Sequence, residues 1–298
     1  MDPECEDMLA GGVEMLHRFH YAEALHCFLL ATQRYPDVAE TWIEAGRALL
    51  RLDRFDEAAE HFEHAVQVDP DHEEAWLWRG RARWFAGQGD EAERSLRKAV
   101  ELAPDHVAGW HDLARLLQEA GRPNEAADCY ARLIEIEPDH ALACKQLGDL
   151  HRGAGRGTQA AACYTRALEI DPDYAEAQLA RAELAAERGE WAPVLRDVEE
   201  ILGYRPRHAG ALVLRGRASA AAGELRRALR DFRRAAKADR SCAEAYRQAA
   251  LLHLRRQDYG RAWKACRDAA YWGVGPDAEV VQELERATGR RAEEELRP

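Results

Sequence analysis

Proline recurs at one fixed interval along most of this 298-residue chain. Six prolines are each separated from the next by 34 residues: Pro36, Pro70, Pro104, Pro138, Pro172 and Pro206. Because chance does not place six prolines in one register, the period indicates tandem copies of one structural unit. Repeats that end two residues after each proline predict eight intervals: 5–38, 39–72, 73–106, 107–140, 141–174, 175–208, 209–242 and 243–276. Residues 1–4 are then an N-terminal tail.

The apolar pattern within each repeat predicts two helices. Places 4, 7, 8 and 11 have the spacing of one helix face, and places 20, 24 and 27 form a second stripe. Small residues at places 8 and 20 allow two helix backbones to approach closely beside larger neighbours. Between the stripes lie glycines suited to a left-handed turn: Gly87, Gly121, Gly155, Gly189 and Gly223. Each repeat is therefore predicted to be a helical hairpin that buries its apolar side only by stacking on its neighbours.

These residues resemble the tetratricopeptide repeat (TPR) family, whose signature is a Trp–Leu–Gly–Tyr set followed by Ala, an aromatic residue, Ala and Pro. The best matches are the repeats that contain Trp42, Trp76 and Trp110. The resemblance implies an all-α, right-handed superhelical solenoid of eight helix-turn-helix units with a concave inner groove. Residues 277–298 are expected to form a C-terminal capping helix and tail. The repeat at 175–208 departs from the pattern, with Gln178 where tryptophan is expected, and its regularity stays open.

Composition and charge argue against several classes of protein. The net charge is −12, so the chain is not expected to coat nucleic acid non-specifically. The charge is uneven, because residues 1–140 hold 30 acids and 14 bases whereas residues 141–298 hold 24 acids and 28 bases. An acidic N-terminus and the lack of a long apolar stretch predict no signal peptide, no membrane span and a cytoplasmic location. Seven cysteines without a CxxC pair are interpreted as reduced thiols.

No motif in the sequence predicts catalysis, a cofactor or a metal site. The glycine-rich run at 153–158 lacks a lysine and follows a helix, so a phosphate loop is not expected. His61 and His64 have a spacing that could hold a metal, but a solvated helix face is the preferred interpretation. Neither GxSxG nor HExxH is present. Histidines that close four repeats are interpreted as turn residues: His72, His106, His140 and His208. We therefore predict that the protein is not an enzyme.

The candidate binding residues come from the face that, by the resemblance, lines the groove. Place 9 holds arginine in three consecutive repeats, Arg47, Arg81 and Arg115, which form a ladder. Near the ladder fall Leu77, Trp78, Trp84, Phe85 and His111. Arginines and exposed aromatic residues together are typical of interface hot spots. The alternative is that these arginines pair with nearby acids such as Glu44 and Asp112.

The predicted function is a non-catalytic scaffold or adaptor that holds a peptide or partner protein in the groove. The cationic ladder within an acidic half favours an acidic, partly apolar segment as the ligand. We expect a monomer that binds neither nucleic acid nor membrane. Two alternatives stay open: a subunit that recruits substrates to a separate enzyme, and a structural protein that self-assembles.

Overall fold

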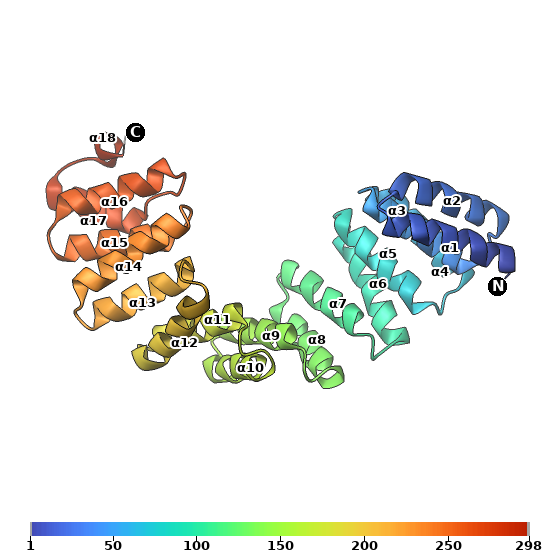
Figure 1. Cartoon of the computed structure of the whole chain (residues 1–298), viewed down its shortest axis with the longest axis horizontal. Helices are drawn as coiled ribbons and strands as arrows, with labels where there is room; N and C mark the ends of the chain where they lie inside the picture. The colour runs from blue at the N-terminus through green and yellow to red at the C-terminus, as the bar shows by residue number, and fades with distance from the viewer. Residues whose placement is uncertain (1, 297–298) are drawn as a thin grey trace. The chain divides into compact units, whose positions relative to one another are not determined.

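The computed structural model describes residues 2–296, and within them the chain is built from α-helices without strands (Figure 1). The helices are α1 (Pro3–His17), α2 (Tyr21–Arg34), α3 (Ala39–Arg51), α4 (Phe55–Val68), α5 (Glu73–Phe85), α6 (Gly89–Leu102), α7 (Val107–Glu119), α8 (Pro123–Ile136), α9 (Ala141–Gly153), α10 (Gly157–Ile170), α11 (Ala175–Glu187), α12 (Trp191–Tyr204), α13 (Ala209–Ala221), α14 (Leu225–Ala238), α15 (Ala243–Arg255), α16 (Tyr259–Tyr271), α17 (Ala278–Thr288) and α18 (Ala292–Glu295). The predicted all-α repeat fold is confirmed, with eight helix pairs followed by a capping helix, α17. The short α18 was not predicted.

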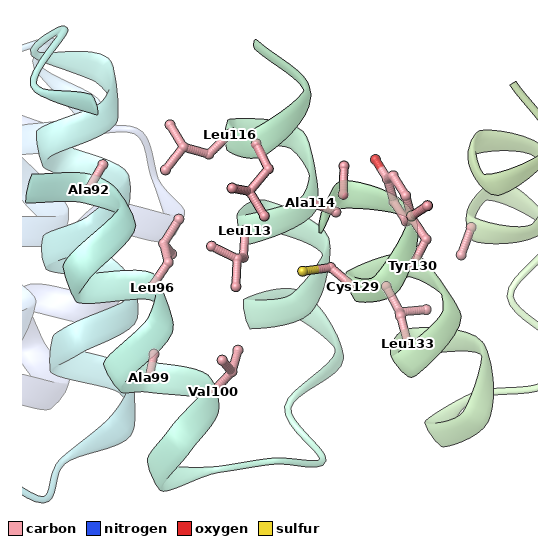
Figure 2. Close-up of a cluster of buried hydrophobic side chains, with 14 of the residues drawn as sticks. Ala92, Leu96, Ala99, Val100, Leu113, Ala114, Leu116, Cys129, Tyr130 and Leu133 are labelled. Atoms are coloured by element: carbon pink, nitrogen blue, oxygen red, sulfur yellow. The ribbon is translucent and has the colours of Figure 1, made fainter. Parts of the chain in front are cut away.

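The helices group into two compact halves, Met1–Leu150 and His151–Pro298, called here the N-terminal half and the C-terminal half. In the N-terminal half, one buried cluster joins α6, α7 and α8 (Figure 2). Leu96 of α6 and Leu113 of α7 belong to it, as does Tyr130 of α8, and all three are almost fully buried. Consecutive helices thus share one apolar layer, as stacked hairpins require.

The eighth place of a repeat is small because a large side chain from the second helix lies against it. A Cβ atom added to Gly46 would lie 2.7 Å from the ring of Phe62, and one added to Gly216 would lie 2.5 Å from the ring of Phe232. Both distances are far below van der Waals contact. The predicted pairing of a small residue on the first helix with a large one on the second is therefore what sets the close approach of the helices.

The recurring tryptophans have a polar role as well as an apolar one. The indole Nε1 of Trp42 donates to the carbonyl of Pro36 at 2.9 Å, and Trp76 and Trp110 donate in the same way to Pro70 and Pro104. In the divergent sixth repeat, the amide of Gln178 donates to the carbonyl of Pro172 at 3.0 Å. The amide of Gln178 therefore takes the place of the indole as the donor to the proline carbonyl. This repeat keeps its helical hairpin, α11 and α12.

The turn between the two helices is left-handed in every repeat. Five repeats place glycine there, with φ between 72° and 79°. The other three repeats place Phe19, Asp53 and Gln257 at the same position, with φ of 63°, 57° and 57°. Side chains with a Cβ are disfavoured in this conformation, by roughly 1–2 kcal/mol.

Histidines cap three of the first helices. The Nδ1 atoms of His106, His140 and His208 accept hydrogen bonds from the backbone N–H of Gly109, Ala143 and Ala211 at 3.1–3.2 Å. Their interpretation as turn residues is confirmed, and the contact shows why this residue type suits the turn: a neutral imidazole can satisfy a free helix N–H.

Candidate functional site

A hollow of about 740 Å³ opens on the N-terminal half and is called here the N-terminal groove. Helices α1, α3 and α5 form most of its wall, and the turns that follow α1 and α3 form its rim. Its lining residues are Val13, Leu16, His17, Phe19, Tyr21, Glu44, Arg47, Leu50, Arg51, Asp53, Phe55, Trp78, Arg81, Phe85 and Asp112. The first helix of each repeat lines the groove because its face of small residues packs against the second helix. The opposite face of the first helix is left open.

Trp78 lies at the centre of the predicted cationic ladder. The guanidinium of Arg81 lies 4.5 Å from the centroid of its ring, and that of Arg47 lies 5.3 Å away. The indole Nε1 donates to Glu74 at 2.9 Å, which fixes the ring. Since guanidinium groups are attracted to the faces of indole rings, two arginines from successive repeats are held against one aromatic surface.

Each arginine of the ladder also has a carboxylate partner. Arg47 Nη1 lies 2.6 Å from Glu44 Oε1, and Arg81 Nε lies 2.5 Å from Asp112 Oδ2. Arg115 is 4.0 Å from Glu119. The side chain of Arg81 is 23% exposed, against 40% for Arg47 and 51% for Arg115. Pairing with acids, the alternative drawn from the sequence, is therefore present, and the middle arginine is the least accessible of the three.

The pKa values of the two partner carboxylates, Glu44 and Asp112, are shifted in opposite directions. Burial raises the pKa of Glu44 above its ordinary value, although the charge of Arg47 opposes the shift. Burial also acts to raise the pKa of Asp112, but hydrogen bonding to His111 and the charge of Arg81 outweigh it, so that the pKa is lowered. Asp112 thus stays ionised at neutral pH and holds Arg81 in place.

The predicted site residues divide into three groups. Arg47, Trp78, Arg81 and Phe85 come together in the N-terminal groove. Three others do not line it: Arg115, Trp84 and His111. The guanidinium of Arg115 lies 4.9 Å from the ring centroid of Trp84, and Trp84 stacks on Phe85 beside the groove. His111 contacts Tyr130 and Asp112.

Leu77 is a correction to the predicted site. Its side chain is 3% exposed and belongs to the buried cluster around Leu96 and Leu113. Place 5 of the repeat faces the core rather than the groove, as the 3% exposure of Ile43 at the same place also shows. Leu77 therefore stabilises the stack and is not a surface for a ligand.

The sequence interpretation named Phe85 but missed the other aromatic residues at the rim of the groove, Phe19, Tyr21 and Phe55. Phe19 is 77% exposed and lies edge-on to Tyr21, with ring centroids 6.2 Å apart. Phe85 is 60% exposed and lies 5.5 Å from the ring of Phe55. One signal was present: Phe19 stands at the turn position that is glycine in five other repeats. A bulky residue held in a left-handed turn and exposed to water is a candidate for a functional contact.

The other candidates singled out from the sequence have structural contacts. The rings of His61 and His64 lie 5.6 Å and 4.5 Å from the ring of Trp42, so both pack against an aromatic surface. Within residues 2–296 no three His, Cys, Asp or Glu side chains gather closely enough to hold a metal ion. The same part of the chain has no helix with the length and apolarity needed to cross a lipid bilayer.

Comparisons with known proteins agree with the geometry of the repeats. Two models of the tetratricopeptide repeat match the sequence, one at residues 20–72, 43–107, 145–192 and 213–274 and the other at residues 85–147. Together they cover well over half of the chain. No curated protein matches the sequence.

Several solved structures are similar to this chain. A tetratricopeptide repeat protein from Parabacteroides merdae shares 21% identity at a TM-score of 0.63, over 85% of this chain and 99% of that one. YrrB, a TPR protein with an unusual peptide-binding site, shares 19% at 0.54, over 62% and 95% of the two chains. PilF from Pseudomonas aeruginosa shares 16% at 0.57, over 74% and 96%. At these identities the similarity concerns the fold.

Proposed function

Because the chain belongs to the tetratricopeptide repeat family, we propose that it is a non-catalytic scaffold or adaptor that holds a segment of a partner protein in its N-terminal groove. A cytoplasmic location and a monomeric state before binding are part of the proposal. YrrB has a peptide-binding site, and a groove built from the first helices of successive repeats offers a comparable platform for an extended chain.

The observation that carries the proposal is the exposed aromatic rim. Phe19 and Phe85 expose most of their surface to water. Phe19 does so in a left-handed backbone conformation, which is unfavourable for a residue with a Cβ atom. Exposed apolar groups clustered beside a hollow are typical of interaction sites. A ligand that covers these rings would gain the hydrophobic free energy that the free protein lacks.

The arginines of the groove favour acidic groups in the ligand. Arg47, Arg51 and Arg81 line it together with the acids Glu44, Asp53 and Asp112, in a half of the chain whose balance is strongly acidic. Arg47 keeps 40% of its side chain exposed although it pairs with Glu44. The proposed ligand is therefore an acidic segment with apolar side chains, which are the parts that Phe19 and Phe85 would contact.

The test compares peptide affinities of three proteins. Peptides are selected from a random phage-displayed library on the wild type, synthesised, and titrated by fluorescence anisotropy against Phe19→Gly/Phe85→Ser. We expect the double variant to lose at least about tenfold in affinity, because it removes both exposed aromatic contacts. Added salt should weaken the wild-type complex if the arginines contact acidic groups.

The matched control is Gln257→Gly. It places glycine at the equivalent left-handed turn of the eighth repeat, outside the groove. Its affinity should equal that of the wild type, and circular dichroism should show that all three proteins are folded. Equal affinity of the double variant and the wild type would disprove the proposed site.

A further inference from the structure

A second charged surface lies on the C-terminal half and takes no part in the proposed groove. Helix α14 buries Ala228, Leu229, Phe232 and Ala235, so its opposite side faces solvent. That side carries a row of cations: Arg226, Arg230, Arg233, Arg234 and Lys237. With Arg261 of α16 and Leu229 they line a hollow of about 510 Å³ that has no acidic lining residue.

Most cations of this row have no carboxylate partner. Arg234 lies 3.8 Å from Asp231, and Arg261 lies 2.8 Å from Asp258. Within the part of the chain that the structure describes, Arg226, Arg230, Arg233 and Lys237 form no ion pair. Like charges three or four residues apart on a helix repel one another, so the row lowers the stability of α14. By contrast, all three arginines of the N-terminal ladder are paired with acids.

A second hollow, lined by both polar and apolar residues, adjoins the cationic one. It has a volume of about 560 Å³ and shares Arg233, Lys237 and Arg261 with it. Its exposed aromatic surface comes from Trp272, which is 40% exposed, whereas Phe232 and Tyr246 are buried in its wall, and Asp268 is its acidic lining residue. Cations and apolar surface are thus continuous across α14, α15 and α16.

We propose that this basic surface binds a short acidic segment of a partner protein that carries an aromatic side chain. The glutamates or aspartates of the segment would contact the row on α14, and its aromatic side chain would enter the adjoining hollow. Four of the five cations in the row are arginines, whose planar donors match carboxylates in pairs.

The size of the surface favours a peptide over nucleic acid. From Arg226 to Lys237 the row is about 16 Å long at the rise of an α-helix, which an extended segment of about five residues can span. A long polyanion would continue beyond the row and meet acids such as Asp268, which lines the adjoining hollow, and Asp258, which pairs with Arg261. A short acidic segment neutralises the row and ends there.

The experiment uses a fluorescein-labelled peptide of glutamates around one central tryptophan, titrated against the full chain. Arg230→Glu/Arg233→Glu should weaken binding by about tenfold or more, since it replaces two attractions by two repulsions. Arg230→Gln/Arg233→Gln should weaken it by a smaller factor, and this variant also removes repulsion within α14. A peptide with alanine in place of tryptophan should bind the wild type several-fold more weakly.

The matched control is Arg255→Glu/Arg286→Glu, which makes the same charge change at two exposed arginines outside both hollows. Its affinity should stay within about twofold of the wild type. Circular dichroism checks that each variant is folded. The proposal is overturned if the glutamine variant binds like the wild type or if the control loses as much affinity as the site variants. Tighter binding of a single-stranded oligonucleotide or of phosphatidylserine vesicles than of the peptide would also overturn it.

Discussion

Single side chains decide how closely the two helices of a repeat approach. Gly46 and Phe62 show the principle, because the ring occupies the space that a Cβ on Gly46 would need. The sequence predicted this pairing, since small and large residues recur at fixed places. It could not predict which large residue lies against each glycine, such as Leu96 against Gly80, because several large residues fit beside the same glycine.

Gly46→Ala should therefore destabilise the protein by about 1–3 kcal/mol, because the methyl group displaces the buried ring of Phe62. Gly203→Ala is the control: Gly203 lies in α12 with nothing within 4 Å of an added Cβ. This second change should be neutral or stabilise by up to about 1 kcal/mol, from helix propensity. Urea unfolding of both variants measures the difference, and equal effects would show that the close contact is unimportant.

His208 makes stability depend on pH. Its Nδ1 accepts from the N–H of Ala211, and burial together with the charge of Arg205 lowers its pKa below the ordinary 6.5. The unfolded chain therefore binds a proton at this histidine more readily than the folded protein does. As a result, the contribution of neutral His208 to the stability of the fold is present above pH 6.5 and declines as the pH falls below that value. His208→Asn keeps a capping acceptor but does not titrate.

Between neutral pH and about pH 5.5, the His208→Asn variant should lose less stability than the wild type. Chemical unfolding at the two pH values gives the comparison. Alanine at this position should instead cost about 1 kcal/mol at neutral pH, from the lost cap. An identical pH dependence in wild type and asparagine variant would contradict this role.

At the scale of the helical hairpin, a buried ion pair replaces an apolar contact in two repeats. Arg181 binds Asp197 through two hydrogen bonds of 2.8 Å and 2.9 Å, and Arg215 binds Asp231 in the same way at 2.9 Å and 2.7 Å. In the fourth repeat the equivalent places hold Leu113 and Cys129. The sequence interpretation missed these pairs because an arginine and an aspartate on a helix are usually solvated. The signal was their joint presence 16 residues apart in two repeats.

Arg181→Leu alone should destabilise the C-terminal half by about 3–5 kcal/mol, because Asp197 is 2% exposed, loses both hydrogen bonds from Arg181 and keeps only Arg196 at 4.0 Å. The double variant Arg181→Leu/Asp197→Cys reproduces the fourth repeat and should recover most of that loss. Thermal and urea unfolding of the single and double variants form a mutant cycle. A double variant as unstable as the single one would show that the pair does not act as a unit.

At the scale of the whole molecule, the sequence predicted the fold far better than the site. Proline spacing and helical periodicity determine the repeats, because each is a local property of the chain. The groove depends on contacts between repeats, such as those of Arg47 and Arg81 with the ring of Trp78. A single sequence does not reveal which acid each arginine meets, nor that Leu77 turns inward while Trp78 does not.

In a stack of hairpins, the loss of stability caused by a substitution should be confined to the substituted repeat and its neighbours. Ala92 is completely buried in α6, so Ala92→Leu forces extra carbon atoms into the seam and should cost about 1–3 kcal/mol. Hydrogen–deuterium exchange should show faster exchange in α5 to α8 and unchanged protection in α13 to α16. Uniform loss of protection along the chain would contradict nearest-neighbour coupling.

The central claim is that the N-terminal groove holds a segment of a partner, and site-specific photo-crosslinking tests it most directly. The photoreactive residue p-benzoylphenylalanine replaces Phe85 in the groove or Leu30, which is 44% exposed on α2 outside it. A peptide selected on the wild type should crosslink efficiently to the protein labelled at Phe85 and weakly to the one labelled at Leu30. Equal crosslinking at both positions, or crosslinking at Leu30 alone, would contradict the account.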